Sequence, residues 1–422
     1  MATVPAELEP AERIPVAEQI AGERSNIVRL YAARAVRGFG DGFAAIVLPA
    51  YLSEIGYTPL QIGIVATAAL FGSAVMTLAV GFFAPRHDLR NLLLVCAGLM
   101  VATGLALPNF EHLAFVAAIV FIGTMNPSTG DIGVHVPLEH AALARITSDQ
   151  DRTRIFARYS LAGALATAAG ALAAAVPAVL ASSGIDKVTA LKVMFYCYGA
   201  LGLVGAALYW GLPHAKVQQS NPGAGALGPS RGIVYRLAAL FSLDAFAGGF
   251  AVQSLVALWL FEQFGMSLAA ASVFFFWANT FAAFSYPVAA WLSKRIGLVN
   301  TMVFTHIPSS ICLILAALSG NLTIVLALLL VRAALSQMDV PTRTSYVMAV
   351  VTPAERPAAA SVTAVPRSLA SSISPTLAGA LLATAFPGLP LIICGSLKIA
   401  YDLSLLYSFR HIRPPEERPS GA

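Results

Sequence analysis

Charged residues are scarce in this chain, and their scarcity excludes most soluble folds. Only 11% of the 422 residues are Asp, Glu, Lys or Arg, whereas 58% are hydrophobic. A soluble domain carries about 25% charged residues, so most of this chain cannot face water. The excess of basic residues, a net charge of +5, is therefore expected to set the orientation of the chain in a lipid bilayer. Nucleic-acid binding needs basic residues gathered on one face, and they are not gathered here.

Residues for metal, redox or nucleotide chemistry are also few. The four cysteines, Cys96, Cys197, Cys312 and Cys394, lie in apolar runs without a CxxC motif, as small buried hydrophobic residues do. The seven histidines are scattered, and no Walker A pattern is present. The tails are too short for the output domain of a sensor, and no signal-peptide pattern opens the chain. We therefore expect no metal, no cofactor and no enzymatic activity.

Long apolar runs fill the rest of the chain. A membrane-spanning helix needs about 20 such residues, and about twelve segments qualify. They cover 28–53, 59–84, 90–108, 113–143, 153–180, 188–212, 233–261, 268–292, 298–319, 322–350, 357–384 and 389–410. The sequence thus predicts an all-α integral membrane protein with twelve transmembrane helices.

Lys and Arg are distributed unevenly between the predicted loops. Every second connection is basic, whereas the alternate connections lack Lys and Arg, except for the turn at Lys187. Basic loops stay in the cytoplasm. This pattern predicts a multi-pass protein of the cell inner (plasma) membrane with both termini cytoplasmic.

The two halves of the chain repeat each other. Phe39-Gly40-Asp41-Gly42-Phe43-Ala44 resembles Phe246-Ala247-Gly248-Gly249-Phe250-Ala251, and Val136-Pro137 precedes Asp151-Arg152 by the interval that separates Val340-Pro341 from Glu355-Arg356. Parallel repeats of this size are typical of secondary transporters. We expect a cytoplasmic tail (1–27), a six-helix bundle (28–212), a Gly- and Pro-rich cytoplasmic linker (213–232), a second six-helix bundle (233–411) and a second tail (412–422).

Local motifs add a family resemblance. After the second span, Gly81, Arg86 and Arg90 fit a Gly-x-x-x-Asp-Arg-x-Gly-Arg-Arg pattern, with Pro85 in place of the Asp. The second repeat keeps Lys294, Arg295 and Gly297 at the equivalent turn. With its six plus six spans, the chain resembles the major facilitator superfamily. The resemblance implies two pseudo-symmetric six-helix bundles that alternate access to a central site.

Ionisable residues inside spans are costly and usually functional. Arg34, Arg37 and Asp41 of the first span lie on one helical face, at spacings of four and seven. Asp41 is the deepest, so we interpret it as a candidate for proton coupling, with a structural ion pair to Arg37 as the alternative. Arg37 is also a candidate for substrate binding.

The fourth span carries Asp131, His135 and Glu139 among Pro127, Gly130 and Pro137. A broken helix is tolerated in a membrane only against protein or water, so this region is expected to line a cavity or gate. Asp131 and Glu139 are further candidates for proton coupling, with the end of the helix as the alternative position for Glu139. His135 is a candidate for substrate binding, and we expect no metal.

The repeat offset maps Glu139 onto Arg343 and His135 onto Asp339. Symmetry-related positions face each other across the bundle interface, so we hypothesise that Glu139 and Arg343 approach each other and close the cytoplasmic side. Asp244, near the cytoplasmic end of the seventh span, is a third gate candidate, with helix-end solvation as its alternative.

Further polar residues are candidates for binding a substrate. They are Gln253, Asn279, Arg332 and Asp339. Arg332 lies mid-span, where it can meet an anionic group of the substrate or a carboxylate, with a structural hydrogen bond to backbone carbonyls as the alternative. Lys398 and Asp402, four residues apart in the last span, are predicted to form an internal pair.

The function predicted from these features is secondary active transport of a small organic solute. Several carboxylates within spans favour proton coupling, and export is the first choice of direction. Proton-coupled uptake of a nutrient or metabolite is the alternative, because the chain lacks the fourth-span Arg and the fifth-span Gly-Pro that drug/proton antiporters of the family tend to carry. The expected partners are the solute, protons and the lipid bilayer, and the protein is expected to be a monomer.

Overall fold

The chain folds entirely into helices where its structure is described. The computed structural model describes residues 16–83, 87–128, 133–147, 149–214, 227–352 and 355–412, and these ranges contain no strand. The first half comprises α1 (Val16–Glu54), α2 (Pro59–Phe83), α3 (Leu89–Ala106), the 3-10 helix η2 (Leu107–Asn109), α4 (Leu113–Ile122), α5 (His135–Arg145), α6 (Asp149–Ala173), α7 (Val176–Ser182) and α8 (Lys187–Trp210). The second comprises α9 (Arg231–Gly249), α10 (Gln253–Phe264), α11 (Leu268–Ile296), α12 (Leu298–Leu318), α13 (Leu322–Ser336), α14 (Asp339–Val350), α15 (Arg356–Leu382) and α16 (Leu389–Phe409).

The helices make twelve crossings in the predicted order. In the described residues, nine segments are long and apolar enough to cross a membrane. The other three crossings are α1, which carries several charges, the interrupted pair α4 and α5, and α15, which is rich in Ser, Thr and Pro. Because α1 has 39 residues, it is about 58 Å long at 1.5 Å per residue and exceeds a hydrocarbon core of about 30 Å.

Three crossings are broken near their middle. The predicted break in the fourth span lies between Ile122 and His135. The tenth span breaks between Ser336 and Asp339, so α5 and α14 begin 204 residues apart (339 − 135), as the repeat requires. The seventh span also breaks, between Gly249 and Gln253, whereas its counterpart α1 is continuous.

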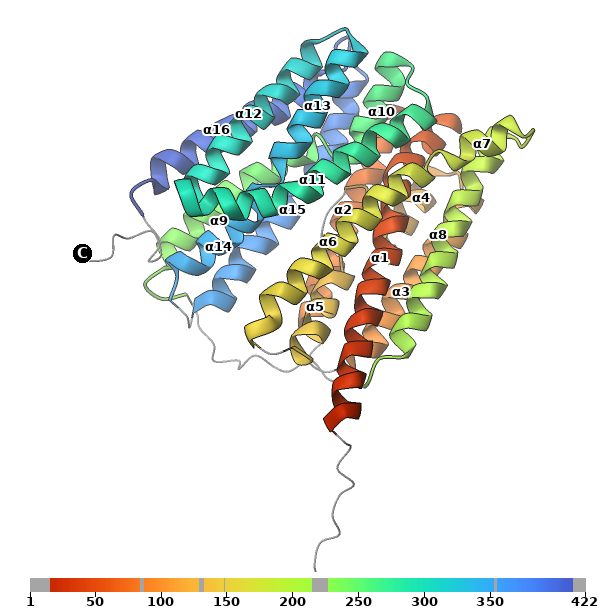
Figure 1. The fold of residues 1–422 in the computed structure, drawn as a ribbon. Coiled ribbons are helices and arrows are strands. Elements are labelled where there is room, and N and C mark those ends of the chain that lie inside the picture. Colours follow the sequence, from red (N-terminus) through yellow and green to blue (C-terminus); the bar gives the residue numbers. More distant parts are fainter. Residues whose placement is uncertain are drawn as a thin grey trace, which may run out of the picture.

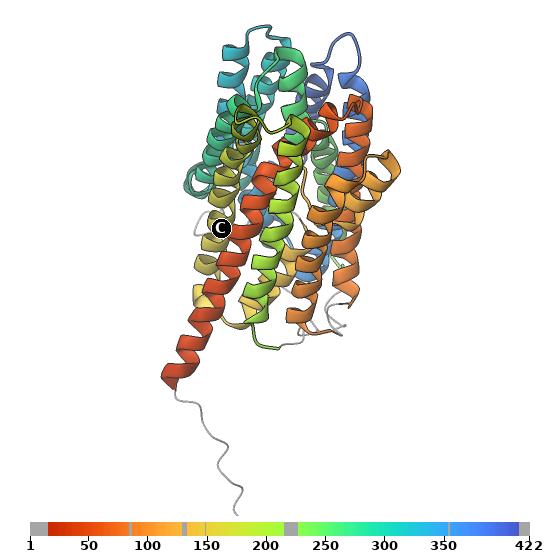
Figure 2. The same cartoon turned by 90° about the vertical axis from the view of Figure 1, so that its right-hand side faces the viewer.

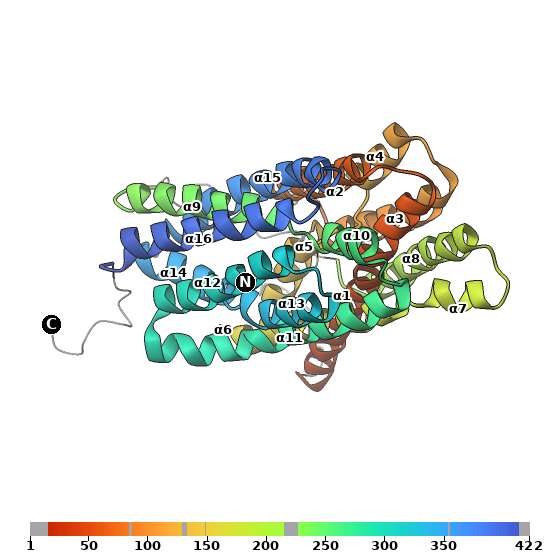
Figure 3. The same cartoon turned by 90° about the horizontal axis from the view of Figure 1, so that it is seen from above.

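The two halves form two bundles that lie side by side (Figure 3). Within the first bundle α1 packs closely on α6, because Gly42 faces the backbone of Thr167 and Gly170 faces that of Phe39. Small residues allow this approach where no hydrophobic effect separates helix from lipid. The helices of the first bundle run along its long axis (Figure 2). In Figure 1, α1 begins at the bottom and α16 ends at the left, and the side of the molecule that carries these two ends is here named the terminal face. The opposite side, where α1 ends and α2 begins, is named the far face.

Among the described residues, the two bundles share one core, and helices of both bundles come together near the far face (Figure 1). One cluster of buried residues joins the ends of both bundles there, and it includes Tyr51, Val65, Leu255 and Phe275. Toward the terminal face each bundle has a core of its own, around Leu93 in the first and around Val303 in the second. The bundles therefore meet at the far face and pack separately at the terminal face.

Candidate functional site

Glu139 is the centre of a buried polar cluster in the first bundle. The α5 helix places it opposite α1, and its side chain is fully buried. Arg37 Nη2 donates to Glu139 Oε2 over 2.7 Å, and Tyr209 Oη donates to Oε1 over 2.5 Å. The hydroxyl group of Tyr159 also donates to Oε2. Glu139 is therefore held by an ion pair and two hydroxyl groups, and it does not simply mark a helix end.

His135 belongs to the same cluster. It begins α5, is 3% exposed and stacks on Tyr209, with ring centroids 6.4 Å apart and planes inclined by 26°. The fold thus brings together three predicted site residues, Arg37, His135 and Glu139. Asp131 lies outside the described residues.

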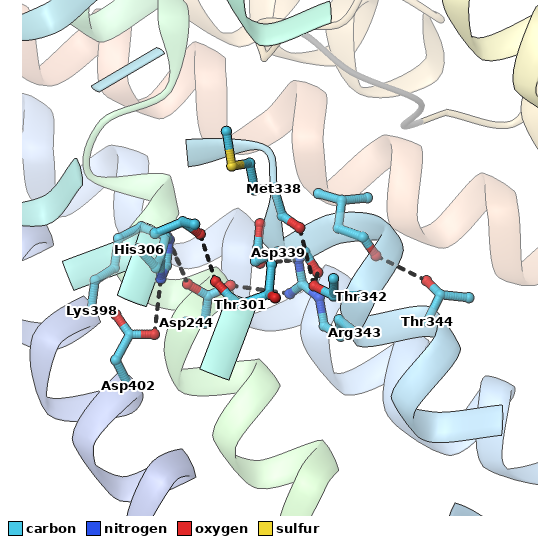
Figure 4. A network of polar contacts seen from close by, with 12 residues as sticks. Asp244, Thr301, His306, Met338, Asp339, Thr342, Arg343, Thr344, Lys398 and Asp402 are labelled. Carbon is cyan, nitrogen blue, oxygen red and sulfur yellow. Dashed lines mark hydrogen bonds and ion pairs between the residues drawn. The ribbon is translucent and has the colours of Figure 1, made fainter. Parts of the chain in front are cut away.

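A second buried cluster lies in the other bundle (Figure 4). Arg343 Nη1 donates to Oδ2 of Asp244, in α9, over 3.1 Å, and Lys398 Nζ donates to Oδ1 of the same carboxylate over 2.6 Å. Arg343 Nη2 also contacts Asp339 Oδ2, one helical turn away, over 2.6 Å. Asp244 is only 4% exposed, so the alternative of helix-end solvation is wrong.

The two clusters are related by the sequence repeat, with their charges exchanged. The offset between Phe39 and Phe246 is 207 residues, which maps Arg37 onto Asp244 (37 + 207). The offset of 204 maps Glu139 onto Arg343 (139 + 204). The first bundle pairs a cation on its first crossing with an anion on its fourth, and the second bundle pairs an anion with a cation at the equivalent positions.

Asp41 lies near the first cluster but outside its ion pair. It is 8% exposed, accepts a hydrogen bond from Tyr198 Oη over 3.4 Å and faces the backbone N–H of Asn126, in the break of the fourth crossing. In the described part of the chain, Arg37 forms its ion pair with Glu139 and none is formed by Asp41. The alternative of a structural Arg37–Asp41 pair is therefore wrong for this conformation.

Two predicted substrate-binding amides lack protein partners. Gln253 is the first residue of α10 and Asn279 lies in α11. Their amide nitrogens are buried, and no hydrogen-bond acceptor for them occurs among the described residues. A buried amide without a partner costs about 1–3 kcal/mol, which a bound solute or water can recover.

Two arginines inside the second bundle are unpaired. Arg332 of α13 lies near Cys312 and Cys394, and Arg367 of α15 lies near Arg343. Within the described ranges neither guanidinium forms a hydrogen bond or an ion pair. Arg367 was not among the predicted site residues, because Pro366 and Ser368 beside it gave no signal of a buried position.

The predicted internal pair of Lys398 and Asp402 is wrong. Lys398 reaches across to Asp244, whereas Asp402 contacts His306 Nδ1 over 3.1 Å. Spacing by four residues allowed the pair, but the neighbouring helices offered each side chain a partner of its own. His306 was missed because a single histidine in an apolar span carries no periodic signal.

Comparison with known proteins identifies the family. The family model of the Major Facilitator Superfamily matches residues 30–278 and 237–422. An uncharacterized membrane protein of Saccharomyces cerevisiae, YJR124C, is 22% identical over 91% of this chain and 94% of its own length.

Solved structures share the fold at low sequence identity. The nucleoside transporter NupG is 13% identical with a TM-score of 0.70, over 92% of this chain and 99% of its own. A bacterial homolog of the human lysosomal transporter Spinster, inward-facing and unoccupied, is 16% identical with a TM-score of 0.68, over 92% and 95%. This chain therefore belongs to the major facilitator superfamily and is a multi-pass membrane transporter of small solutes.

Proposed function

We propose that this transporter couples the movement of an anionic organic solute to the movement of protons. One observation carries the proposal: the guanidinium groups of Arg332 and Arg367 lie half-buried inside the second bundle, without a carboxylate partner among the described residues. Leaving a charge unpaired in a membrane is costly. A carboxylate or phosphate on the solute would complete these two sites, and Gln253 and Asn279 would bind its neutral part.

Asp41 is the proposed proton carrier of the first bundle, and Glu139, in the nearby cluster, is a further candidate. Arg37 is committed to Glu139, so a proton can bind to Asp41 without breaking an ion pair of the described residues. His135 of the first cluster, and Asp339, which pairs with Arg343 in the second, are the proposed contacts for further polar groups of the solute. Asp131 stays a prediction.

The gate is proposed at the terminal face, where the bundles have separate cores. Closing this face brings symmetry mates together, so that Glu139 approaches Arg343 and Arg37 approaches Asp244. Both pairs are complementary in charge, which would bias the bundles toward closure. With the basic loops in the cytoplasm, this conformation would load solute from the cytoplasm of a cell inner membrane.

Export is the proposed direction, because the side that we infer to be open is the side from which an exporter loads. Proton-coupled uptake is the second candidate, favoured by the missing fourth-span Arg and fifth-span Gly-Pro of the drug/proton antiporters. Transport in inverted and right-side-out vesicles separates the two. Accumulation in inverted vesicles under a proton gradient supports export, and accumulation in right-side-out vesicles supports uptake.

The test of substrate class uses purified protein in detergent and matched pairs of probes. Benzoate with benzamide, and glucose 6-phosphate with glucose, differ mainly in charge. At least one anion should raise the melting temperature and change the proton content of the medium, whereas its neutral partner should not. Asp41→Asn should keep the stabilisation and lose the proton signal, and Arg367→Gln should lose the preference for the anion.

Two results would reject the proposal. If the neutral probes raise the melting temperature as much as the anions do, the substrate need not be an anion. If the anion binds without any uptake or release of protons, both in the natural protein and in Asp41→Asn, the protein is a facilitator without proton coupling.

A further inference from the structure

A histidine lies at the back of the second cluster, between helices that the proposed transport path does not use. His306 of α12 is 3% exposed. Its Nδ1 lies 3.1 Å from Asp402 Oδ1 and its Nε2 lies 3.3 Å from Lys398 Nζ, while Asp244 Oδ1 is 3.9 Å from the same Nε2 (Figure 4). One ring thus connects the gate residue Asp244 with Asp402 of α16.

The contacts determine where the ring carries its proton. The ammonium group of Lys398 has donors only, so His306 Nε2 must accept from it. Nδ1 then carries the hydrogen and donates to Asp402 Oδ1. In this arrangement the imidazole is neutral, and its tautomer is set by its two neighbours.

Asp402 has one oxygen free. The residue is fully buried, and its Oδ2 has no hydrogen-bond partner within the described residues. Its contact in the cluster is the neutral ring of His306, since Lys398 is bound to Asp244. The charged and titratable groups in contact with the ring are Asp244, Lys398, Tyr401 and Asp402. Arg343 is bound to Asp244 and Asp339 to Arg343, and α13, which packs against α12, carries Arg332. Asp402 is therefore a buried carboxylate that forms no ion pair with Lys or Arg among the described residues, so a proton on it would neutralise an unpaired charge.

We propose that His306 and Asp402 form a second proton-binding site that acts on the ion pair of Asp244 and Arg343. The inference rests on the proposed proton coupling and adds a site in the other bundle. A proton that arrives at His306 Nε2 replaces the hydrogen bond from Lys398 there. The ring then passes its Nδ1 proton to Asp402 Oδ1, and Asp402 becomes a neutral acid. The ring is left as the Nε2–H tautomer, with two donors, Nε2–H and Lys398, facing each other.

The change of tautomer has a consequence at the gate. Within the described residues, Asp244 Oδ1 lies 3.9 Å from His306 Nε2 and can accept from Nε2–H. Lys398 donates to that oxygen at present. Replacing Lys398 there exchanges a cationic partner of Asp244 for a neutral one. Arg343 is bound to the other oxygen of Asp244. When Asp244 loses its contact with Lys398, its negative charge is shared with one cation fewer, and its ion pair with Arg343 becomes stronger. Proton binding would thereby alter the residue that links α9 to α14.

The test measures the proton on Asp402 directly and needs no solute. Infrared difference spectra of purified protein between alkaline and acidic buffer should contain a protonated-carboxyl stretching band that Asp402→Asn removes. His306→Gln should shift or remove the same band, because the ring contacts that carboxyl group. Asp186→Asn serves as the control, since Asp186 is the exposed N-cap of α8, and should leave the band unchanged.

The outcomes separate this inference from the proposed function. A band that persists in a folded Asp402→Asn protein, judged by an unchanged gel-filtration profile, overturns the site. The site is also overturned if Asp402→Asn removes the band while His306→Gln leaves it unaltered. Proton release on adding an anion, lost in Asp41→Asn, reports separately on the proposed function.

Discussion

At the scale of single residues, one carboxylate shows how a loop is fixed at the terminal face. Glu355, the N-cap residue of α15, accepts hydrogen bonds from the backbone N–H groups of Gly228 and Ser230 over 2.7 and 3.2 Å. The hydroxyl groups of Thr352 and Ser230 also donate to it, and they lower the pKa of Glu355 to about 2. The residue thus joins the start of α9 to the start of α15.

This pKa predicts a pH-dependent contribution to stability. Because the pKa in the folded protein lies below the unfolded value of about 4.3, the carboxylate stabilises the fold above that value. The contribution is lost as the pH falls toward about 2. Glu355→Gln should therefore lower the melting temperature at neutral pH, and the gap to the natural protein should narrow in acid. Glu262→Gln, at an exposed position of α10, should show no such trend. A gap that is constant from neutral pH to about pH 3 would contradict the assignment.

At the scale of helices, a glycine contact joins the two bundles at the far face. Gly63 of α2 lies so close to α15 that a Cβ atom there would come within 3.0 Å of Gly379 Cα. A side chain at Gly379 would press the two helices apart in this conformation. Small residues at such a crossing allow the close approach that this state requires.

Gly379→Leu should therefore move the population away from this conformation. With spin labels at the exposed residues Arg154 and Lys294, at the terminal ends of α6 and α11, the fraction of short distances should increase. Gly81→Leu is the matched control, because a Cβ at Gly81 meets no atom within 4 Å. Identical distance distributions in the two variants would mean that the contact does not limit the motion.

The helices were predictable from the sequence, whereas several side-chain partners were not. Apolar length predicted twelve crossings, and Pro127, Gly130 and Pro137 predicted the break in the fourth, because both depend on local composition. The break at Gln337 and Met338 gave no Gly or Pro signal, and it became visible only through the equivalence of His135 and Asp339. Partners such as His306 and Asp402 lie 96 residues apart in the sequence. Which side chains meet depends on the rotation of each helix about its axis, which the sequence pattern does not give.

The exchange of charge between the bundles was within reach of the sequence. The offset of 207 residues already aligned Phe39 with Phe246, and the same offset aligns Arg37 with Asp244. The sequence did not show which carboxylate forms the ion pair with Arg37. The α5 helix, starting after the break, brings Glu139 to Arg37, and so Asp41 is left outside the ion pair.

At the scale of the whole molecule, hydrogen bonds join the two bundles on the side of the far face. Thr376 Oγ1 of α15 lies 2.8 Å from Thr67 Oγ1 of α2, and the Ser254 N–H donates to Pro127 O over 3.2 Å. A transporter that alternates access must separate such contacts when the far face opens.

A cross-link at this contact should stop the cycle. With Thr67→Cys and Thr376→Cys combined, oxidation should form a disulfide, because the two hydroxyl groups already touch. Solute transport in proteoliposomes should be abolished and should return after reduction, whereas either single variant should be insensitive to oxidant. Full transport with the disulfide in place would show that the bundles do not part at this point.

If oppositely charged symmetry mates close the terminal face, then exchanging the charges of one bundle should oppose closure. The exchange combines Arg37→Glu with Glu139→Arg. The exchange keeps an ion pair within the bundle, so the double variant should be more stable than Arg37→Glu alone, which leaves a buried charge unpaired at a cost of about 3–5 kcal/mol. On closure, however, the new carboxylate at position 37 would face Asp244, and the new guanidinium at position 139 would face Arg343.

The decisive measurement is the distance distribution between spin labels at Arg154 and Lys294 in the natural protein and in this double variant. We expect the short-distance population of the closed terminal face to be present in the natural protein and depleted in the double variant, with a loss of solute transport. A folded double variant that closes as often as the natural protein would contradict the account, because like charges would then meet at the gate without effect.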